Sequence, residues 1–227
     1  MENKGALKAI VIMILAAASV YITLVQAKNV LLTFIIYYGL FCVIVPLVDT
    51  LIIHRKSISD HLRLLGLGPQ GRTQGILIGL AHGVPIYTCM LAAYFLLKDI
   101  VPLGAVDEAV KTWGIDPSHK TVIFAIMVLF NGMVEELLWR GYAYSAARDP
   151  MRAVPTIVLT SLIYTSYHMV TLFAFFGVTP LSLILVGVVL CAGILWGWMR
   201  ERTGTVWASM IGHMLATAGY MTVYLLI

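Results

Sequence analysis

One apolar stretch of the sequence carries charged side chains of both signs. It reads Asn131-Gly-Met-Val-Glu135-Glu136-Leu-Leu-Trp139-Arg140. In a helix, Glu136 and Arg140 lie one turn apart on the same face, with the acid N-terminal to the base, which favours an ion pair. That pair leaves Glu135 without a partner on its own helix, next to Asn131 and Trp139. A carboxylate withdrawn from bulk water in this way suits a general base that works near neutral pH.

Two histidines lie in later apolar stretches, each one helical turn from a hydroxyl side chain. Tyr164 precedes His168, and Thr217 follows His213. At a rise of ~1.5 Å per residue, Glu135 and both histidines lie at similar depths along their helices. The sequence therefore permits one cluster of all three groups. The competing interpretation is a buried polar network that only fixes helix packing.

These polar groups belong to a chain with the composition of a membrane protein. Of its 227 residues, 60% are hydrophobic and 11% are charged, whereas about 25% of the residues of a soluble domain are charged. A charged side chain at the centre of a membrane helix costs about 2.5–3.5 kcal/mol, so such groups mark a function or a polar partner. The net charge of +4 forms no basic stripe with aromatic residues, and we expect no binding to nucleic acid.

The apolar runs predict an all-α fold, a polytopic transmembrane bundle of about seven helices in a single membrane domain, 1–227. Each run is long enough to cross a hydrocarbon core of ~30 Å. They cover residues 8–26, 29–53, 73–97, 120–147, 153–170, 180–199 and 205–226. The stretch 169–179 could add a short re-entrant helix and make eight elements. We interpret the loop 98–119 as a solvated connector.

The basic residues between the runs predict the orientation of the chain in a cell membrane, because cytoplasmic loops are rich in lysine and arginine. With a cytoplasmic N-terminus, ten basic residues lie inside and four outside. The inner ones are Lys4, Lys8, Arg55, Lys56, Arg63, Arg72, Arg148, Arg152, Arg200 and Arg202, and the outer ones are Lys28, Lys98, Lys111 and Lys120. Alternatively, the first run is a signal peptide cleaved after Ala27.

The order of these motifs resembles the CPBP family. This family comprises the type II CAAX prenyl endopeptidases and the Abi-like membrane proteins of bacteriocin processing and self-immunity. The resemblance rests on the diacid and arginine of Glu135-Glu136-x-x-x-Arg140, on an aromatic residue four positions before His168, and on His213. It covers roughly residues 120–220, which become the expected catalytic core, with 1–119 as accessory spans.

The resemblance implies intramembrane proteolysis, with a membrane-anchored or prenylated peptide as substrate and membrane lipid as surroundings. Glu135 would activate water and His168 would orient it. His213, helped by Thr217, would stabilise the oxyanion. Glu136 and Arg140 would support this site as an ion pair.

Two positions depart from the pattern of the family. Tyr164 stands where phenylalanine is usual, and Thr217 stands where prenyl proteases carry asparagine. Threonine keeps a hydroxyl donor but reaches less far, and an oxyanion donor is worth about 2.7–4 kcal/mol in the transition state. The change at Thr217 therefore leaves two substrate classes open, CAAX-type prenylated tails and peptide or bacteriocin precursors.

Other chemistries remain open from the sequence. Glu135, His168 and His213 also form a two-histidine, one-carboxylate set, which suits catalytic zinc. Because the sequence contains no His-Glu-x-x-His motif, we favour a protease without a cofactor and keep the zinc enzyme as the alternative. A proton-coupled transporter also uses intramembrane acids and histidines. A non-catalytic immunity or scaffold protein that retains the fold is the third possibility.

Overall fold

The computed structural model describes residues 3–148 and 151–227, which form helices and contain no strand. The helices are α1 (Asn3–Val20), α2 (Val30–Thr33), α3 (Val45–Leu47), α4 (Ile58–Leu64), α5 (Arg72–Leu97), α6 (Gly104–Thr112), α7 (Lys120–Ile126), α8 (Gly132–Glu136), α9 (Tyr144–Arg148), α10 (Ala153–Phe176), α11 (Pro180–Thr203) and α12 (Trp207–Leu226). Between them lie the π-helical segments η1 (Tyr21–Gln26), η2 (Phe34–Ile44), η3 (Val48–Ile53), η5 (Met127–Asn131) and η6 (Leu137–Ala143), and the 3₁₀ turn η4 (Pro117–His119).

Several of these segments join into helices that can cross a membrane, and the predicted all-helical, multi-pass membrane fold is confirmed. In the described part of the chain, six helices are long and apolar enough: Gly5–Gln26, Val30–Ile53, Arg72–Leu97, Lys120–Arg148, Ala153–Phe176 and Pro180–Thr203. The seventh predicted span corresponds to α12, a 20-residue helix that is not among these six. Its buried residues include Ser209, His213 and Thr217, so α12 faces protein more than lipid.

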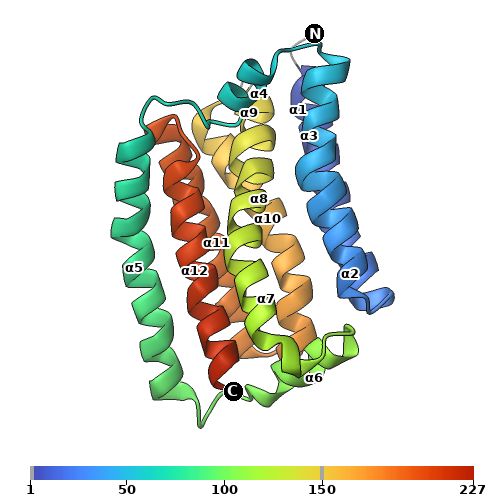
Figure 1. Cartoon of the computed structure of the whole chain (residues 1–227), viewed down its shortest axis with the longest axis vertical. Helices are drawn as coiled ribbons and strands as arrows, with labels where there is room; N and C mark the ends of the chain where they lie inside the picture. Colours follow the sequence, from blue (N-terminus) through green and yellow to red (C-terminus); the bar gives the residue numbers. More distant parts are fainter. Residues whose placement is uncertain (1–2, 149–150) are drawn as a thin grey trace.

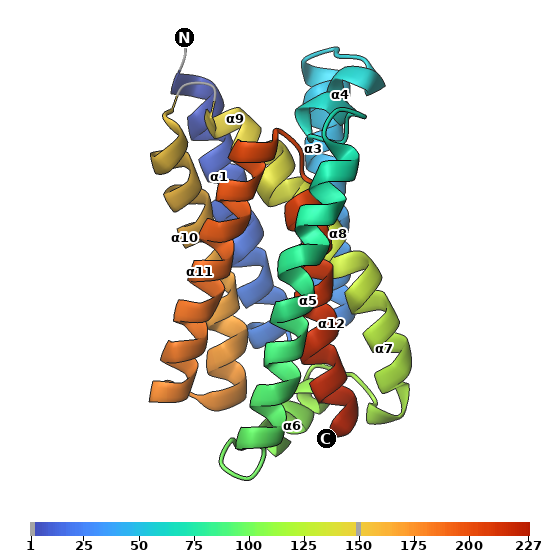
Figure 2. The same ribbon diagram turned by 90° about the vertical axis from the view of Figure 1, so that its left-hand side faces the viewer.

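The helices surround the segment that carries the diacid motif. The two ends of the chain lie at opposite ends of the bundle (Figure 1), as an odd number of crossings requires. Figures 1 and 2 both show α5 alongside α12, and α10 packs on α11. The helix α7–α9 lies between α12 on one side and the first two spans on the other. Side chains from both sides therefore reach it.

Two sequence predictions about connecting segments were wrong. The fifth helix continues to Phe176, so residues 169–176 extend α10 and form no re-entrant element. The segment 98–119 is not a plain solvated connector, because it contains α6 with an apolar face. Val106, Val110 and Trp113 follow the i, i+4, i+7 spacing of such a face, and the Trp113 ring packs on Phe175 with centroids 5.1 Å apart.

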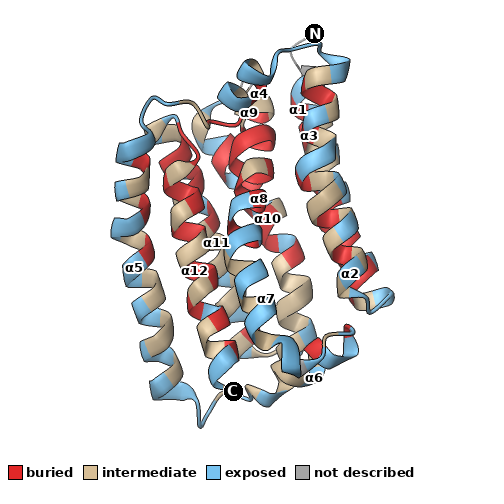
Figure 3. Cartoon of the chain, viewed as in Figure 1, coloured by how far each residue is buried: buried red, intermediate tan, exposed pale blue. Residues whose placement is uncertain are grey.

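Burial is uneven along the bundle. Figure 3 shows the buried residues concentrated on α8, on the turns that follow it and on the adjoining half of α12. The largest fully buried side chains include Trp139, Arg140, Glu135 and Glu136. The most deeply buried part of the protein thus contains the charged motif of the sequence.

Candidate active site

Helix α8 carries both carboxylates between two π-helical segments, η5 and η6. A π-helical turn contains more residues than an α-helical turn, so it shifts the direction of the side chains that follow. Such turns are frequent at functional sites. Gly132 at the start of α8 lets α12 approach closely. A Cβ atom at this position would lie 2.8 Å from the backbone nitrogen of Met214. This close packing brings the carboxylates of α8 next to His213.

Glu136 is the centre of a buried ionic group. Arg140 donates from Nη1 to Oε1 of Glu136 over 2.8 Å, which is the pair that the spacing predicts. His213 Nδ1 lies 3.1 Å from the same oxygen. An ionised carboxylate only accepts hydrogen bonds, so Nδ1 is the donor. This leaves Nε2 of His213 directed towards Glu135, 3.9 Å from its Oε2 atom.

The guanidinium of Arg140 is satisfied by more than its ion pair. Its Nη2 atom donates to the carbonyl of Gly193 over 3.1 Å. The group also lies over the ring of Tyr164, 4.4 Å from the centroid, and 5.4 Å from that of Trp196. A buried charge is stable only with such partners. Glu136 and Arg140 are therefore a structural pair that also fixes His213.

Glu135 has a different environment from its neighbour. Its side chain is 1% exposed, and two tyrosines from other helices bind its carboxylate. Tyr167 of α10 donates to Oε2, and Tyr38 of η2 lies 3.3 Å from Oε1. Trp139 follows one turn later, and its ring stacks near that of Tyr167. The adjacent carboxylates are thus divided, one bound to arginine and one to hydroxyl groups.

His168 lies one layer further from the carboxylates. Its Nδ1 atom is 3.1 Å from the carbonyl of Tyr164 on its own helix. Its ring packs on Tyr167, with centroids 4.1 Å apart, and Tyr167 in turn binds Glu135. The structure thus brings Glu135, Glu136, Arg140 and His213 together directly, and His168 adjoins them through Tyr167.

Thr217 is completely buried and reaches the site through Asn131. The Nδ2 atom of Asn131 lies 3.5 Å from Oγ1 of Thr217. On its other side, the Asn131 carbonyl accepts a hydrogen bond of 2.5 Å from Tyr38. Because Tyr38 also contacts Glu135, a continuous polar chain connects Thr217 to that carboxylate.

Two residues of the site, Tyr38 and Tyr167, were absent from the sequence predictions. Helical spacing relates only residues of one helix, whereas both tyrosines reach Glu135 from other helices. A signal existed, because both hydroxyls lie inside apolar spans, away from the interfaces where tyrosine is usually enriched. A hydroxyl in such a place needs a polar partner.

The zinc alternative finds no assembled ligand set. Among residues 3–148 and 151–227, no group of three His, Cys, Asp and Glu side chains is placed to hold a metal ion. His168 is the member that does not fit, because its Nδ1 atom faces a backbone carbonyl and its ring lies against tyrosines.

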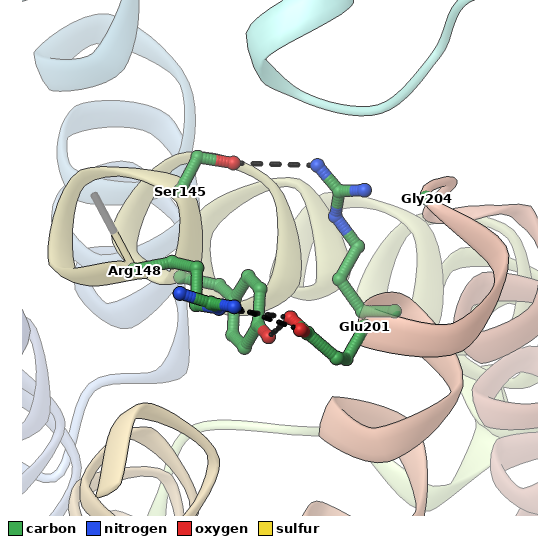
Figure 4. A pocket seen from close by; sticks show the side chains of 6 residues that line it. Ser145, Arg148, Glu201 and Gly204 are labelled. Carbon is green, nitrogen blue, oxygen red and sulfur yellow. Dashed lines mark hydrogen bonds and ion pairs between the residues drawn. The ribbon is translucent and has the colours of Figure 1, made fainter. Parts of the chain in front are cut away.

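A second polar cluster lines an open pocket (Figure 4). It lies beside α9, at the end of the bundle where the N-terminus lies (Figure 1). Arg148 binds Glu201 through two contacts of 3.0 Å, and Tyr144 donates to the same carboxylate. Arg200 reaches Ser145 over 3.3 Å. These groups satisfy one another two helical turns from Arg140, so the cluster is a tie between α9 and α11.

The comparison with known protein families agrees with this geometry. Residues 117–219 match the family described as Type II CAAX prenyl endopeptidase Rce1-like. This part of the chain is similar to that family. The matched region contains both carboxylates, Arg140 and both histidines, and the resemblance seen in the sequence is confirmed. No curated protein and no solved structure matches the chain. The family implies a multi-pass membrane protease that acts on peptides.

Proposed function

We propose that the chain is an intramembrane endopeptidase in which Glu135 activates water. The different partners of the two adjacent carboxylates support this proposal most directly. Glu136 is occupied by Arg140 and His213. Glu135 is equally buried, but its neighbours are hydroxyl groups and Nε2 of His213. The same nitrogen also lies 3.5 Å from the hydroxyl of Tyr164. A buried carboxylate whose partners are hydroxyl groups and a histidine, and that is not paired with an arginine, is suited to accept a proton.

The proposed reaction is peptide hydrolysis without a metal. The oxygen of a water molecule bonds to the peptide carbonyl carbon while its proton moves to Glu135. The carbonyl oxygen becomes an oxyanion beside Nε2 of His213. The carbon–nitrogen bond then breaks, and Glu135 returns the proton to the departing amine. The products are a carboxylic acid and an amine.

The other site residues have supporting roles in this scheme. With His213 protonated, its charge and that of Arg140 balance the two carboxylates, which favours a donor at Nε2. His168 offers its own Nε2 to orient the water from the side of Tyr167. Thr217 holds the polar chain on the opposite side, through Asn131.

The substrate is a peptide bond near the membrane interface, in a CAAX-type prenylated tail or in a bacteriocin or other peptide precursor. We propose that the catalytic core comprises residues 120–220 in a cell membrane, with the N-terminus inside. The accessory residues 1–119 complete the site, because Tyr38 from the second span contacts Glu135.

The test is a cleavage assay with the full chain in lipid vesicles. Prenylated and unprenylated membrane-tethered peptides are compared, with wild type against Glu135→Gln. We expect cleavage by wild type and none by the variant. Cleavage that survives in Glu135→Gln excludes this base. Activity lost to a chelator and restored by zinc would establish the zinc enzyme, and proton-driven uptake without proteolysis would establish a transporter.

A further inference from the structure

Asn131 is a buried amide that the proposed reaction has not yet used. It is 4% exposed and precedes Glu135 by one helical turn. Its Nδ2 atom has two hydrogens and only long contacts, 3.5 Å to Thr217 Oγ1 and 3.3 Å to the hydroxyl of Tyr220. A buried N–H group with weak partners is available to bind something stronger.

Tyr38 fixes which way this amide faces. Its hydroxyl donates to Oδ1 of Asn131 over 2.5 Å. Since the carbonyl side of the amide is engaged there, the NH₂ side is turned towards α12. The contact to Glu135 from the same hydroxyl is longer, at 3.3 Å. The stronger of the two hydrogen bonds therefore holds the asparagine.

The two helices that form the site place their polar residues in matching pairs. Glu135 faces His213 across 3.9 Å. One turn away on each helix, Asn131 faces Thr217 across 3.5 Å. A peptide carbonyl next to Glu135 would therefore have His213 on one side and the Asn131 amide within one helical turn on the other. An oxyanion is best stabilised by preorganised donors in a water-excluded site.

We propose that Asn131 is a catalytic residue that donates a side-chain N–H to the oxyanion, next to Nε2 of His213, and that Tyr38 is its positioning residue. This inference rests on the proposed protease function. Thr217 then keeps the amide in place, and its own hydroxyl is not the main donor. An amide donor is uncharged and carries its hydrogen at every working pH, which complements a histidine donor that must be protonated.

The first experiment compares three variants that remove one polar group each in the full chain. Asn131→Leu keeps the branched shape and removes the donor, and Asn131→Ala serves if the leucine variant does not fold. Removing one oxyanion donor lowers kcat by about 10²–10³-fold, and we expect this loss with KM unchanged. Thr217→Val should cost less than Asn131→Leu. Thr88→Val, at an exposed threonine that binds only its own helix, is the matched control and should retain full activity.

The second experiment asks whether Tyr38 acts through Asn131. Tyr38→Phe should lower kcat in the wild-type background and have no further effect in Asn131→Ala. A loss that persists in Asn131→Ala would show that Tyr38 acts on Glu135 instead, and would overturn its assigned role.

The outcomes separate this inference from the function on which it rests. Full activity in Asn131→Leu, with Glu135→Gln inactive, overturns the inference alone. A larger loss in Thr217→Val than in Asn131→Leu also overturns it and makes the threonine the donor. Absence of cleavage by wild type overturns the protease and the inference together.

Discussion

The indole of Trp196 stacks on the imidazole of His213, with ring centroids 4.4 Å apart and planes inclined by 19°. Because Nδ1 of His213 is also bound to Glu136, the ring is held both at its face and at its edge. Nε2 of His213 therefore points in one direction, towards Glu135. Trp196 lies on α11, a helix for which no role in the site was predicted.

Replacing Trp196 should affect catalysis through this stack. The Nε1 atom of Trp196 is buried and has no hydrogen-bond partner among the described residues, so Trp196→Phe loses no hydrogen bond and keeps a stacking face. Trp196→Leu removes the aromatic pair, worth about 0.5–1.5 kcal/mol, and should lower kcat by up to about tenfold. Cleavage kinetics at equal amounts of folded protein measure the difference. Equal kcat values for the two variants would show that the stack has no catalytic effect.

The Glu136–Arg140 pair should affect folding as well as activity. Arg140→Met leaves a fully buried carboxylate without its cation, which costs about 3–5 kcal/mol. In Glu136→Met with Arg140→Met both charges are gone, so most of the lost stability should return. Catalysis should stay low in this double variant, because His213 has lost its carboxylate partner. Denaturant unfolding in detergent, together with the cleavage assay, separates the two effects. A double variant as unstable as Arg140→Met would show that the unpaired charge is not the cause.

The sequence allowed prediction of the polar pairs within each helix and of most spans. The i, i+4 rule relates Glu136 to Arg140 because both lie on one helix, and composition identifies apolar runs that must be surrounded by lipid. Spacing and composition do not predict contacts between helices, because the register of one helix against another depends on packing. Tyr38 and Tyr167 were therefore missed, and so was the contact of His168 with Tyr167, which binds Glu135.

The same limit explains the errors in the elements. The apolar composition of residues 169–176 fits both a continuous helix and a helix that ends before them. Only the structure shows that α10 continues to Phe176. The acidic residues of 98–119 suggested solvent, whereas its apolar face packs on the bundle through Trp113. In both segments the decisive partner is distant in the sequence.

Two glycines next to the site should differ in how they tolerate alanine. At Gly212 a Cβ atom would lie 1.9 Å from Nε2 of His82, a side-chain atom. At Gly132 it would lie 2.8 Å and 2.9 Å from backbone atoms of Met214. Overpacking of this kind costs about 1–3 kcal/mol, so both Gly212→Ala and Gly132→Ala should lower the unfolding midpoint.

Only one of these losses should be reversible by a second change. His82→Ala removes the clashing ring, so His82→Ala with Gly212→Ala should regain most of the stability. Met214→Ala should not rescue Gly132→Ala, because the backbone of α12 stays where it is. Thermal unfolding in one detergent measures the midpoints of wild type, of the two glycine variants and of the two double variants. Rescue of both glycine variants, or of neither, would contradict the packing described.

Arg200 and Arg148 lie in the same polar cluster (Figure 4) but should differ in their contribution to stability. Arg200 is 9% exposed and donates from Nε to the carbonyl of Arg140 over 2.8 Å. The backbone N–H of Tyr144, four residues after Arg140, donates to other carbonyls. The Arg140 carbonyl therefore lacks the usual α-helical hydrogen bond from Tyr144 and accepts one from Arg200. Arg148 has a side chain that is 39% exposed and pairs with Glu201.

Arg200→Ala should therefore cost more than Arg148→Ala. A buried hydrogen bond from a charged group contributes about 1.5–3 kcal/mol, whereas a solvent-exposed ion pair contributes about 0–1 kcal/mol. The small effect of Arg148→Ala should fall further in high salt, because salt screens exposed charges, and the effect of Arg200→Ala should not. Unfolding midpoints at low and high salt, with Glu201→Gln as the matched control for Arg148, measure both. A loss in Arg200→Ala that disappears in high salt would show that Arg200 acts as a surface charge, since the hydrogen bond to Arg140 is protected from salt by its burial.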